Sequence, residues 1–320
     1  MKQKITIGTR SSKLALWQAN HIKEELLKNY PHFNIELKEI KTKGDHISDV
    51  ALSKIGTKGL FTKEIEDALL NNAIDLAVHS LKDLPTKLPD GLKIGAVLKG
   101  EEPFDILISK NKIKFNDLKP GSKIGTSSLR RIAQLRAIRP DLEYLDLRGN
   151  LDTRIRKLEE GQYDAIVVAY AGVKRLGFED KITEHFNPKD ILPAVGQGAL
   201  AIEVRENDNE TTELISVLND EETFLISRTE RKFLEKLQGG CQVPIGAYTE
   251  IEGKEAILYG LIASLDGKKI IKDKIIGKSE INECKQIGEN LAKTLLQMGG
   301  GEILREINVE APKLGISTGV

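Results

Sequence analysis

Arginine is unevenly distributed along this chain, and its distribution points to anion binding. Seven of the 13 Arg residues fall between Arg130 and Arg156. The segment Lys119–Glu160 holds 10 basic and 6 acidic residues, a local net charge of +4. The planar guanidinium group of arginine is suited to bidentate hydrogen bonding with carboxylates and phosphates. The cluster therefore predicts an anion site, and a solvated helix face with ion pairs is the alternative.

Three turns place arginine beside small polar residues, between an expected strand and an expected helix. They are Gly8–Ser12 (GTRSS), Gly125–Arg131 (GTSSLRR) and Leu147–Asn150 (LRGN), the last followed by Arg154. Free N–H groups at a helix N-terminus and serine hydroxyls suit a bound anion. Simple helix capping by serine is the alternative. None of the turns matches a nucleotide-binding P-loop, so carboxylates are as suitable as phosphates.

The segment His79–Pro85 (HSLKDLP) closes an expected buried strand with charged residues. Asp83 would lie at the carboxyl end of that strand, where it could move a proton or stabilise a cationic intermediate. Lys82 could pair with a substrate carboxylate. The alternative is that both residues are surface charges in a turn. His79 is expected to lie in the core.

Of the two cysteines, only one lies in a setting that suggests chemistry. Cys241 stands in the loop Gly239–Pro244 (GGCQVP), where glycine permits close backbone approach. A loop thiol can act as a nucleophile if its thiolate is favoured, although no Cys–His–Asn set is legible in the sequence. An inert thiol is the alternative, and it is the expectation for Cys284, which lies on a helical pattern.

Two glycine-rich stretches suggest other roles. Gly196–Ala201 (GQGALA) formally matches a dinucleotide motif, but an expected strand follows it rather than a helix, so a nucleotide site is rejected. Gly44–Phe61 is long for a connection between a strand and a helix. Such a loop can be a lid over an active site, and disorder is the alternative.

The elements that must position these residues alternate between strands and helices through the first 200 residues. This alternation indicates parallel or mixed sheets with helices on both faces. The pattern breaks at Gly100–Pro103, and Gly196–Val204 would return the chain to the first sheet. Two α/β domains with a hinge are therefore expected, with a ligand in the cleft at the carboxyl ends of the strands. A separate α+β domain follows. The expected domains are 1–99 plus 195–218, 100–194, and 219–320.

Composition excludes several classes of protein. The 48 Lys+Arg residues balance the 48 Asp+Glu residues, and a net charge of zero argues against broad binding to nucleic acid or an anionic membrane. The longest apolar run, Ala165–Val173, is too short for a membrane span, and the N-terminus lacks a signal-peptide core. Two cysteines cannot build a disulfide framework, and no zinc-binding pattern is present. A cytoplasmic protein without a metal is expected.

The chain closely resembles the porphobilinogen deaminase (hydroxymethylbilane synthase) family. Seven segments carry the resemblance, in the family's order, between residues 8 and 247, and their conjunction is highly specific. The segments are Gly8–Ala19 (GTRSSKLALWQA), Lys58–Leu70 (KGLFTKEIEDALL), Asp75–Thr86 (DLAVHSLKDLPT), Gly125–Arg131 (GTSSLRR), Leu147–Arg154 (LRGNLDTR), Leu192–Glu203 (LPAVGQGALAIE) and Gly239–Ala247 (GGCQVPIGA).

The resemblance implies a transferase of haem and tetrapyrrole biosynthesis. Such an enzyme joins four porphobilinogen molecules head to tail with loss of four ammonia molecules, and water then releases hydroxymethylbilane. A dipyrromethane cofactor, itself two linked porphobilinogen units, would be bound through a thioether to Cys241. Asp83 would be the catalytic carboxylate, which assists loss of the aminomethyl nitrogen and stabilises the cationic azafulvene.

The family fold is two periplasmic-binding-protein-like (type II) doubly wound domains with a hinge, plus a small C-terminal α+β domain that carries the cysteine. Each porphobilinogen bears an acetate and a propionate, so the growing chain gathers negative charge. The resemblance implies cofactor binding by Lys82, Asp83, Ser128, Arg130, Arg131 and Arg148. It implies substrate binding by Arg10, Ser12, Thr126, Arg148, Arg154, Arg175 and Gln197, with Ser80 as a polar companion. Lys54 and Lys58 lie in the stretch that resembles the family's lid.

Tyr170 is bulkier than expected at its position in Ala169–Gly172 (AYAG), and it is the one noticeable difference from the family pattern.

Two rival functions remain open at this stage. A cytosolic two-domain solute-binding protein without catalysis would share the architecture, but it has no use for Cys241. Nucleic-acid binding through the arginine-rich stretch would show steep salt dependence, and the interleaved acidic residues argue against it. The family suggests a monomer that acts on the small molecule porphobilinogen.

Overall fold

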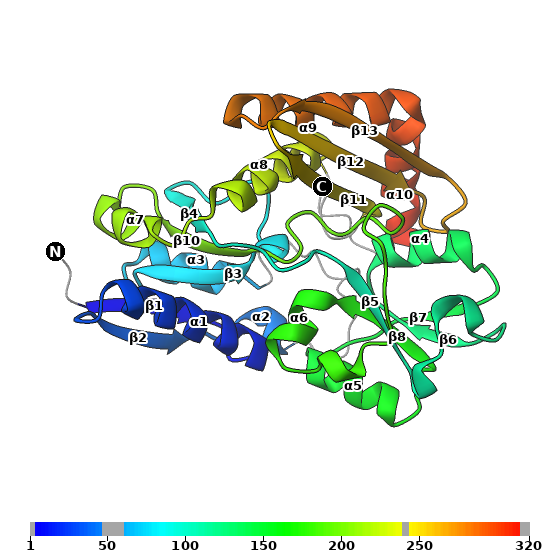
Figure 1. Ribbon diagram of the computed structural model, residues 1–320, viewed down its shortest axis with the longest axis horizontal. Helices are drawn as coiled ribbons and strands as arrows, with labels where there is room; N and C mark the ends of the chain where they lie inside the picture. Colours follow the sequence, from blue (N-terminus) through cyan, green and yellow to red (C-terminus); the bar gives the residue numbers. More distant parts are fainter. Residues whose placement is uncertain (1–3, 47–60, 239–242, 314–320) are drawn as a thin grey trace. The chain divides into compact units, whose positions relative to one another are not determined.

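Three sheets organise the parts of the chain that the computed structural model describes, which are residues 4–46, 61–238 and 243–313 (Figure 1). Within these ranges the chain divides into two compact units. The first unit holds residues 4–46, 61–101 and 198–224. The second holds residues 102–197, 225–238 and 243–313. Within the described residues the chain therefore passes between the units three times, after residues 101, 197 and 224.

The first unit is built on a five-stranded sheet of order β2-β1-β3-β10-β4, in which β10 is the antiparallel strand. Leu76 and Val78 of β3 pack with α1 and α7, whereas Ala77 packs with α3 on the opposite face. The elements are β1 (Lys4–Thr9), α1 (Lys13–Asn29), β2 (Asn34–Glu39), α2 (Lys43–His46), α3 (Lys63–Leu70), β3 (Leu76–Ser80), β4 (Leu92–Val97), β10 (Leu200–Arg205) and α7 (Asn209–Ser216).

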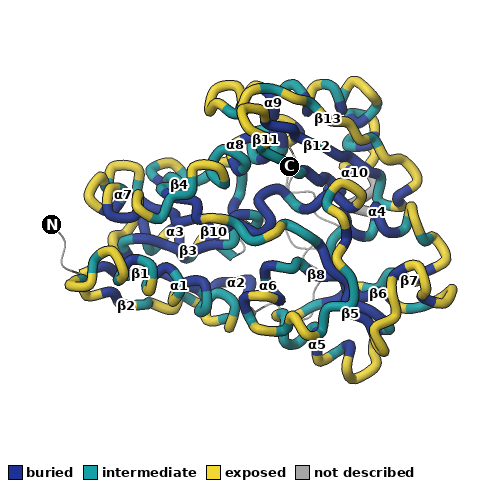
Figure 2. Tube along the Cα trace, in the orientation of Figure 1, coloured by how far each residue is buried: buried dark blue, intermediate teal, exposed yellow. Residues whose placement is uncertain are grey.

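The second sheet, of order β7-β6-β8-β5-β9, repeats this topology with β5 as the antiparallel strand next to the third parallel strand. In β8, Ala165 and Val167 pack with α4, whereas Ile166 and Val168 pack with α5. Strand β5 is buried along its length, and β8 is buried except at its last residue, Ala169 (Figure 2). The elements are β5 (Asp105–Ser109), β6 (Lys123–Gly125), α4 (Leu129–Ile138), β7 (Glu143–Leu145), α5 (Leu151–Glu159), β8 (Ala165–Ala169), α6 (Tyr170–Arg175) and β9 (Glu184–His185).

The third sheet is an antiparallel meander of order β11-β12-β13 in the second unit. Its apolar residues pack on α8, α9 and α10, and Leu261 and Ala263 pack with Ala133 of α4. The elements are α8 (Glu221–Lys236), β11 (Ile245–Glu252), β12 (Glu255–Ala263), β13 (Ile270–Lys278), α9 (Ile281–Leu295) and α10 (Gly301–Lys313). Short helical turns lie at η2 (Leu81–Asp83), η3 (Lys110–Lys112), η4 (Phe115–Asp117), η5 (Glu179–Lys181) and η6 (Leu296–Gly300).

The predicted fold class, two doubly wound α/β sheets and a small α+β part, is confirmed. The division into three domains remains a prediction, because the second and third sheets share one compact unit. The sequence pattern missed α10. Apolar spacing predicts a last helix over Ile281–Met298, and the glycine run that follows it predicts its end. In the structure Gly299 takes a left-handed φ of +109°, and the chain then continues as a new helix. No helix among the described residues is long and apolar enough to cross a membrane.

Candidate active site

Two polar turns lie at one edge of the first sheet. Strands β1 and β3 are parallel, with Gly8 opposite Ala77, so their carboxyl ends meet at the same edge. The turn after β1 carries Arg10 and Ser12, and η2 after β3 carries Lys82 and Asp83. The sequence prediction that these residues follow strand ends is confirmed. Lys82 is half-buried and Asp83 is exposed, so this carboxylate is available to a ligand.

Neighbouring contacts fix this edge of the first sheet. The Ser12 hydroxyl caps α1 by accepting a hydrogen bond from the Ala15 N–H at 3.3 Å. Gln18 of α1 donates from Nε2 to the Ser80 hydroxyl at 2.9 Å, which ties α1 to the end of β3. The Arg10 guanidinium carbon lies 4.4 Å from the centre of the Phe61 ring. Ser12 thus has the capping role that was the alternative, and its role in anion binding remains a prediction.

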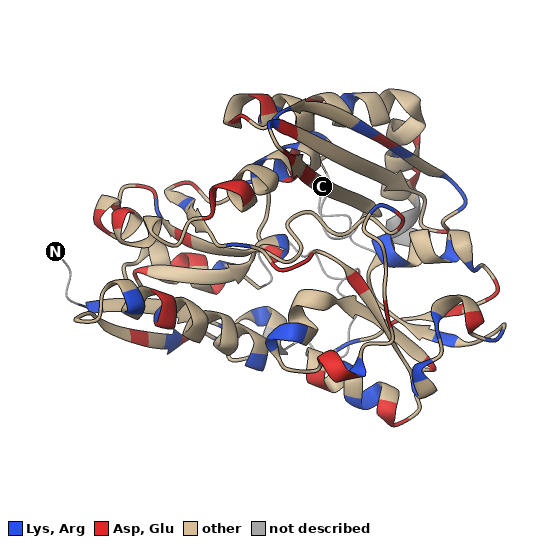
Figure 3. Ribbon diagram, in the orientation of Figure 1, with Lys and Arg blue, Asp and Glu red and all other residues tan. Residues whose placement is uncertain are grey.

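The corresponding edge of the second sheet gathers most of the predicted arginine site. Thr126 and Ser128 follow β6, and Arg148 follows β7, which is parallel to β6. Asp105, the first residue of the antiparallel strand β5, lies opposite Ala169 at the end of β8. The carboxyl ends of three parallel strands and the start of β5 therefore meet here. Basic residues lie in the first turns of α4 and α5 at this edge (Figure 3).

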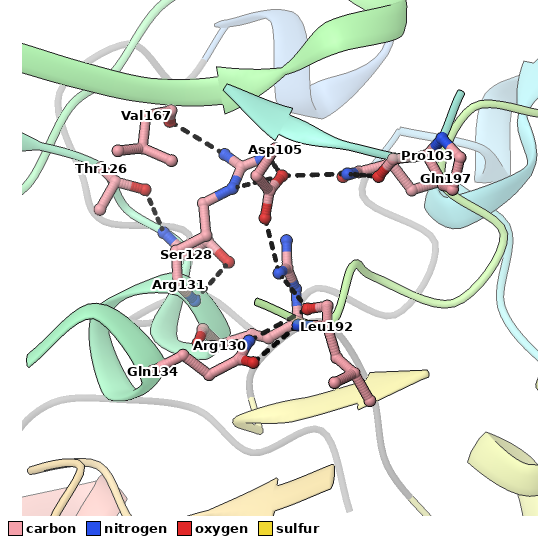
Figure 4. A network of polar contacts seen from close by, with 10 residues as sticks. All are labelled: Pro103, Asp105, Thr126, Ser128, Arg130, Arg131, Gln134, Val167, Leu192 and Gln197. Carbon is pink, nitrogen blue, oxygen red and sulfur yellow. Dashed lines mark hydrogen bonds and ion pairs between the residues drawn. The ribbon is translucent and has the colours of Figure 1, made fainter. Parts of the chain in front are cut away.

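The centre of this edge is a buried ion-pair network (Figure 4). Arg130 Nη1 donates to Asp105 Oδ2 at 2.7 Å and to the Leu192 carbonyl at 2.6 Å. Arg131 donates to Asp105 Oδ1 from Nε at 3.0 Å and from Nη2 at 2.7 Å, and from Nη1 to the Val167 carbonyl at 3.1 Å. The three side chains are 1–6% exposed. One carboxylate thus orients both guanidinium groups.

Two glutamines complete the network from other segments. Gln197 Nε2 donates to Asp105 Oδ1 at 3.0 Å and to the Pro103 carbonyl at 2.6 Å. Gln134 Nε2 donates to the Leu192 carbonyl at 3.0 Å, and its Oε1 accepts from the Leu192 N–H at 2.8 Å. Ser128 caps α4 by accepting from the Arg131 N–H at 3.5 Å, while its own N–H donates to Thr126 Oγ1 at 3.4 Å. The polar groups around Asp105 are therefore held by several independent contacts.

The network carries a net positive charge, because two guanidinium groups share one carboxylate. Burial alone would raise the pKa of Asp105, but the charges and hydrogen bonds of Arg130 and Arg131 outweigh it and hold that pKa well below its usual range. Burial lowers the pKa of Arg130, although Asp105 opposes that effect. A buried excess of positive charge is stabilised by an anion, so the site is electrostatically prepared for carboxylate ligands.

We expect Asp105→Asn to destabilise the fold by about 3–5 kcal/mol, because it leaves two buried guanidinium groups without their carboxylate. Chemical denaturation at pH 7 measures this loss. The lowered pKa of Asp105 means that its stabilisation is present above the unfolded-state pKa of about 3.9 and is lost as pH falls further. The difference in unfolding free energy between wild type and variant should therefore shrink at low pH.

Asp141→Asn is the matched control, because Asp141 pairs with Arg139 at 2.7 Å on the surface of the same unit. Its side chain is 37% exposed, so the expected loss is much smaller than that of Asp105→Asn. Equal losses for the two variants would contradict the assignment of Asp105 as the buried anchor.

Three other predicted arginines of the second unit differ in exposure and contacts. Arg148 is half-buried, and its Nε lies 3.2 Å from Asp146 Oδ2. Arg154, on α5, donates from Nε to the Gly149 carbonyl at 2.8 Å. Arg175, at the end of α6, is 8% exposed. The turn before α5 depends on Gly149, whose φ of +103° disfavours any other residue.

Several predicted residues lie outside the described part of the chain. They are Lys54, Lys58 and Cys241, so the structure does not place the predicted lid or the predicted attachment site. Cys284 lies on α9, as the helical pattern predicts, and is fully buried, while its inertness remains a prediction. His79 is buried as predicted, with Nε2 3.1 Å from Glu203 Oε2.

The structure also places the Gly196–Gly198 turn and Tyr170, which the sequence analysis singled out. The turn Gly196–Gly198 leads into strand β10 rather than a helix, as expected when the dinucleotide site was rejected. Tyr170 begins α6, where its hydroxyl donates to Glu179 Oε1 at 3.2 Å. Its ring centroid lies 6.5 Å from that of Phe104 and 5.3 Å from that of His185.

Sequence reasoning missed two residues of the network, Asp105 and Gln134, and a third buried polar residue of the same unit, Glu230. Asp105 opens a strand predicted over residues 105–109, and an acidic residue at the start of an otherwise apolar strand is the signal of a buried partner. Gln134 and Glu230 lie on helical patterns among other polar residues, and the sequence around them offers no comparable signal. All three are buried.

Two family models match the chain in succession. The one described as "Porphobilinogen deaminase, dipyromethane cofactor binding domain" matches residues 5–213. The one described as "Porphobilinogen deaminase, C-terminal domain" matches residues 224–297. The two matches together span most of the chain.

Curated proteins are similar to the chain over almost its whole length. The porphobilinogen deaminase of Carboxydothermus hydrogenoformans is 53% identical over 311 residues, which cover 97% of this chain and 99% of that protein. The porphobilinogen deaminase of Syntrophomonas wolfei is 51% identical over 304 residues, covering 94% and 98%. Among solved structures, that of the methionine binding protein MetQ has a TM-score of 0.45 at 12% identity, covering 71% of this chain and 95% of that one.

Proposed function

The chain belongs to the porphobilinogen deaminase family, and from that premise we propose how its residues divide the work of the reaction. Enzymes of the family are transferases of tetrapyrrole biosynthesis with a dipyrromethane cofactor. They join four porphobilinogen molecules head to tail with loss of ammonia and release hydroxymethylbilane by hydrolysis. The resemblance predicted from the sequence is confirmed by the family matches.

The buried arginine network is the observation that best supports a dipyrromethane site in this chain. Two linked porphobilinogen units bear two acetates and two propionates, so the cofactor needs cations and N–H donors. Arg130 and Arg131 supply both, with the net positive charge that remains after pairing with Asp105. Arg148, Lys82 and Ser128 are the further proposed ligands, and Cys241 is the proposed thioether attachment. The donor set fits the group.

When bound, the dipyrromethane would supply a pyrrole ring with a free α-carbon, onto which the product chain grows. The remaining steps need a carboxylate that can act on the incoming porphobilinogen. Asp83 is exposed at the end of β3, beside the turn that carries Arg10. We assign three roles to Asp83. Its carboxylate accepts a hydrogen bond from the pyrrole N–H and assists the departure of the amine. It also stabilises the positive charge that develops on the substrate as ammonia leaves.

Substrate carboxylates are assigned to the polar residues at the edges of the two sheets. Each added unit brings two more negative charges, so several cations are required. The proposed set is Arg10, Ser12, Thr126, Arg148, Arg154, Arg175 and Gln197, and Lys54 and Lys58 are proposed to belong to a lid. The proposed domains are 1–99 plus 195–218, 100–194, and 219–320, the last of which would carry Cys241.

The partner of the reaction is a small molecule, porphobilinogen, as in the family. We further propose that the chain acts as a monomer in the cytoplasm without binding nucleic acid. Its zero formal net charge supports the last point. Light scattering of the purified protein tests the monomer, since a mass of twice 35.5 kDa would contradict it.

Incubation of the purified protein with porphobilinogen tests the proposed function directly. The expected result is four ammonia molecules released and one hydroxymethylbilane formed for every four porphobilinogen molecules consumed. Binding of porphobilinogen without release of ammonia would instead support a solute-binding protein.

Arg148→Glu should impair cofactor assembly or chain growth by about 10-fold or more, because it replaces a ligand of carboxylates with a repelling charge. The rate of loading with porphobilinogen and the rate of product formation measure the two effects. Arg156→Glu is the matched control, since Arg156 is exposed on α5 and forms a surface pair with Glu160 at 3.6 Å. Normal loading and normal elongation by Arg148→Glu would remove that residue from the site.

A further inference from the structure

Glu230 is a buried carboxylate that the proposed reaction does not use. It lies on α8 and is 4% exposed. Its Oε2 accepts a hydrogen bond from the Gly196 N–H at 2.8 Å, and its Oε1 accepts one from the Thr249 N–H at 3.0 Å. Burial disfavours the charge of Glu230, and its hydrogen bonds to Gly196 and Thr249 oppose that effect. A carboxylate buried at such a cost requires a reason.

The two N–H groups belong to segments that meet at α8. Gly196 has a φ of +71° in a turn that the Gln197 N–H closes on the Ala194 carbonyl at 3.0 Å. Thr249 lies on β11, which is bonded to the same segment through the Ala247 N–H and the Pro193 carbonyl at 3.1 Å. One carboxylate thus joins α8, β11 and the turn that carries Gln197.

From this turn a short series of contacts leads to the arginines. Gln197 directly follows Gly196, and its Nε2 donates to the Pro103 carbonyl at 2.6 Å and to Asp105 Oδ1 at 3.0 Å. Asp105 Oδ1 is also the atom that accepts both bonds from Arg131 (Figure 4). The position of Gln197 therefore bears directly on the carboxylate that orients the guanidinium groups.

We propose that Glu230 is a positioning residue, whose ionised carboxylate fixes the Gly196 turn so that Gln197 holds Asp105 and, through it, the arginines proposed to bind the cofactor. This inference rests on the proposed function of the arginine network. Glu230 acts only through that network. Small displacements of groups that hold reactants reduce rates strongly, so a loosened turn lowers turnover rather than abolishing it.

Protonation of Glu230 should weaken its hydrogen bonds to the Gly196 and Thr249 N–H groups. Burial raises the pKa of Glu230 to about 7, although its bonds to the Gly196 and Thr249 N–H groups oppose the rise. The ionised form accepts N–H bonds more strongly than the neutral acid. The turn is therefore held most firmly above pH 7 and loosens as pH falls below 7.

The surroundings of Glu230 contain few other groups that could cause such a pH effect. On α8, the residues three and four positions away are Ile226, Ser227, Phe233 and Leu234, and none of them titrates. Residues 192–198 carry no ionisable side chain. On β11, burial together with the charges of Glu250, Glu102 and Glu230 raises the pKa of Tyr248, which keeps Tyr248 neutral at pH 6–8. Glu250 is paired with Lys189 at 2.9 Å.

Glu230→Gln tests the proposal, because glutamine keeps the shape but accepts at only one of its two terminal atoms and does not titrate. The rate of hydroxymethylbilane formation is compared between wild type and variant at pH 8 and at pH 6. We expect the wild-type rate to exceed the variant rate about 10-fold at pH 8, the effect of one hydrogen bond to a charged group, and to match it at pH 6. A wild-type to variant ratio that is the same at both pH values, as a purely structural defect gives, would overturn the proposal.

Glu235→Gln is the matched control, since Glu235 lies on the same helix and pairs with Lys232 at 3.2 Å with 52% of its side chain exposed. Its ratio to wild type should be near one at both pH values. A second variant, Gln197→Ala, removes the contact through which Glu230 acts. Because Gln197 is also proposed to bind substrate, the wild-type to variant ratio need not fall to one at pH 6, but it should still be about 10-fold larger at pH 8 than at pH 6. This variant also decides the matter if Glu230→Gln does not fold.

The double variant Glu230→Gln with Gln197→Ala should be no slower than the slower single variant, because both changes break one series of contacts. If the rate reductions of the two single variants multiply in the double variant, Glu230 does not act through Gln197, and the proposal is contradicted. Wild-type protein that releases no ammonia from porphobilinogen would instead contradict the proposed function. Active wild type with a ratio independent of pH overturns only the role of Glu230.

Discussion

Cys241→Ala is expected to yield a folded protein that carries no covalent cofactor and forms no detectable hydroxymethylbilane. The thioether requires a sulfur atom at this position, and without an attached primer the incoming porphobilinogen has no chain to extend. Intact mass with peptide mapping around residue 241 measures the attachment. Wild-type protein should carry an added mass of two porphobilinogen units less two ammonia molecules, localised to Cys241.

Cys284→Ala is the matched control for this substitution. Cys284 is the other cysteine of the chain, and it is fully buried on α9, with Sγ 3.9 Å from the Lys278 carbonyl. Its variant should load and turn over normally. An unmodified wild-type chain that also stays unmodified after incubation with porphobilinogen would contradict the attachment, and so would normal turnover by Cys241→Ala.

Asp83→Asn is expected to keep the covalent cofactor but to lose about 10²–10⁴-fold in turnover, the range that positioned proton-transfer groups contribute. Asparagine matches the shape of aspartate, so the turn at η2 should persist. The asparagine amide cannot take up a proton near neutral pH, and it carries no negative charge to stabilise a developing cation. The rate of product formation and the intact mass together measure the two parts of this result.

Asp90→Asn is the control for Asp83→Asn, because Asp90 is another exposed aspartate of the same unit, in the turn before β4. Its variant should retain wild-type turnover. Near-wild-type turnover by Asp83→Asn would remove that carboxylate from catalysis. Loss of the added mass in the same variant would instead assign Asp83 to cofactor assembly.

The two substitutions separate attachment from catalysis. Cys241→Ala should remove the added mass and the turnover together, whereas Asp83→Asn should remove only the turnover. The Glu230 variants differ from both, since they should change how turnover depends on pH while the added mass is retained.

Local sequence patterns were sufficient for most of the fold. The apolar run after Phe104 predicts a strand over Asp105–Ser109, which is the observed β5. The helical pattern predicts a helix over Glu222–Leu237, which differs from α8 by one residue at each end. Alternating apolar residues and capping residues act over a few positions, so they are visible in a single sequence. The same locality explains the failure at Gly299, where a glycine run that commonly ends a helix instead separates two helices.

The sequence by itself also determined which residues follow strand ends, and hence that Lys82, Asp83 and Arg148 lie at sheet edges. It left undecided what the arginines contact. Arg131 is 26 residues from Asp105, and Gln197 is 92 residues from it, yet all three meet in one buried network. Their meeting depends on the register between β5 and β8 and on the return of the chain through the Gly196 turn.

Only the tertiary structure decided the electrostatics of the site. Whether a guanidinium is solvated on a helix face or buried against a carboxylate depends on which distant segments exclude water from it. The same is true of Glu230, whose charge is set by burial between α8, β11 and the Gly196 turn. Residue types and spacing therefore fixed the chemistry available to this protein, and packing between distant segments fixed the charge and orientation with which that chemistry is presented.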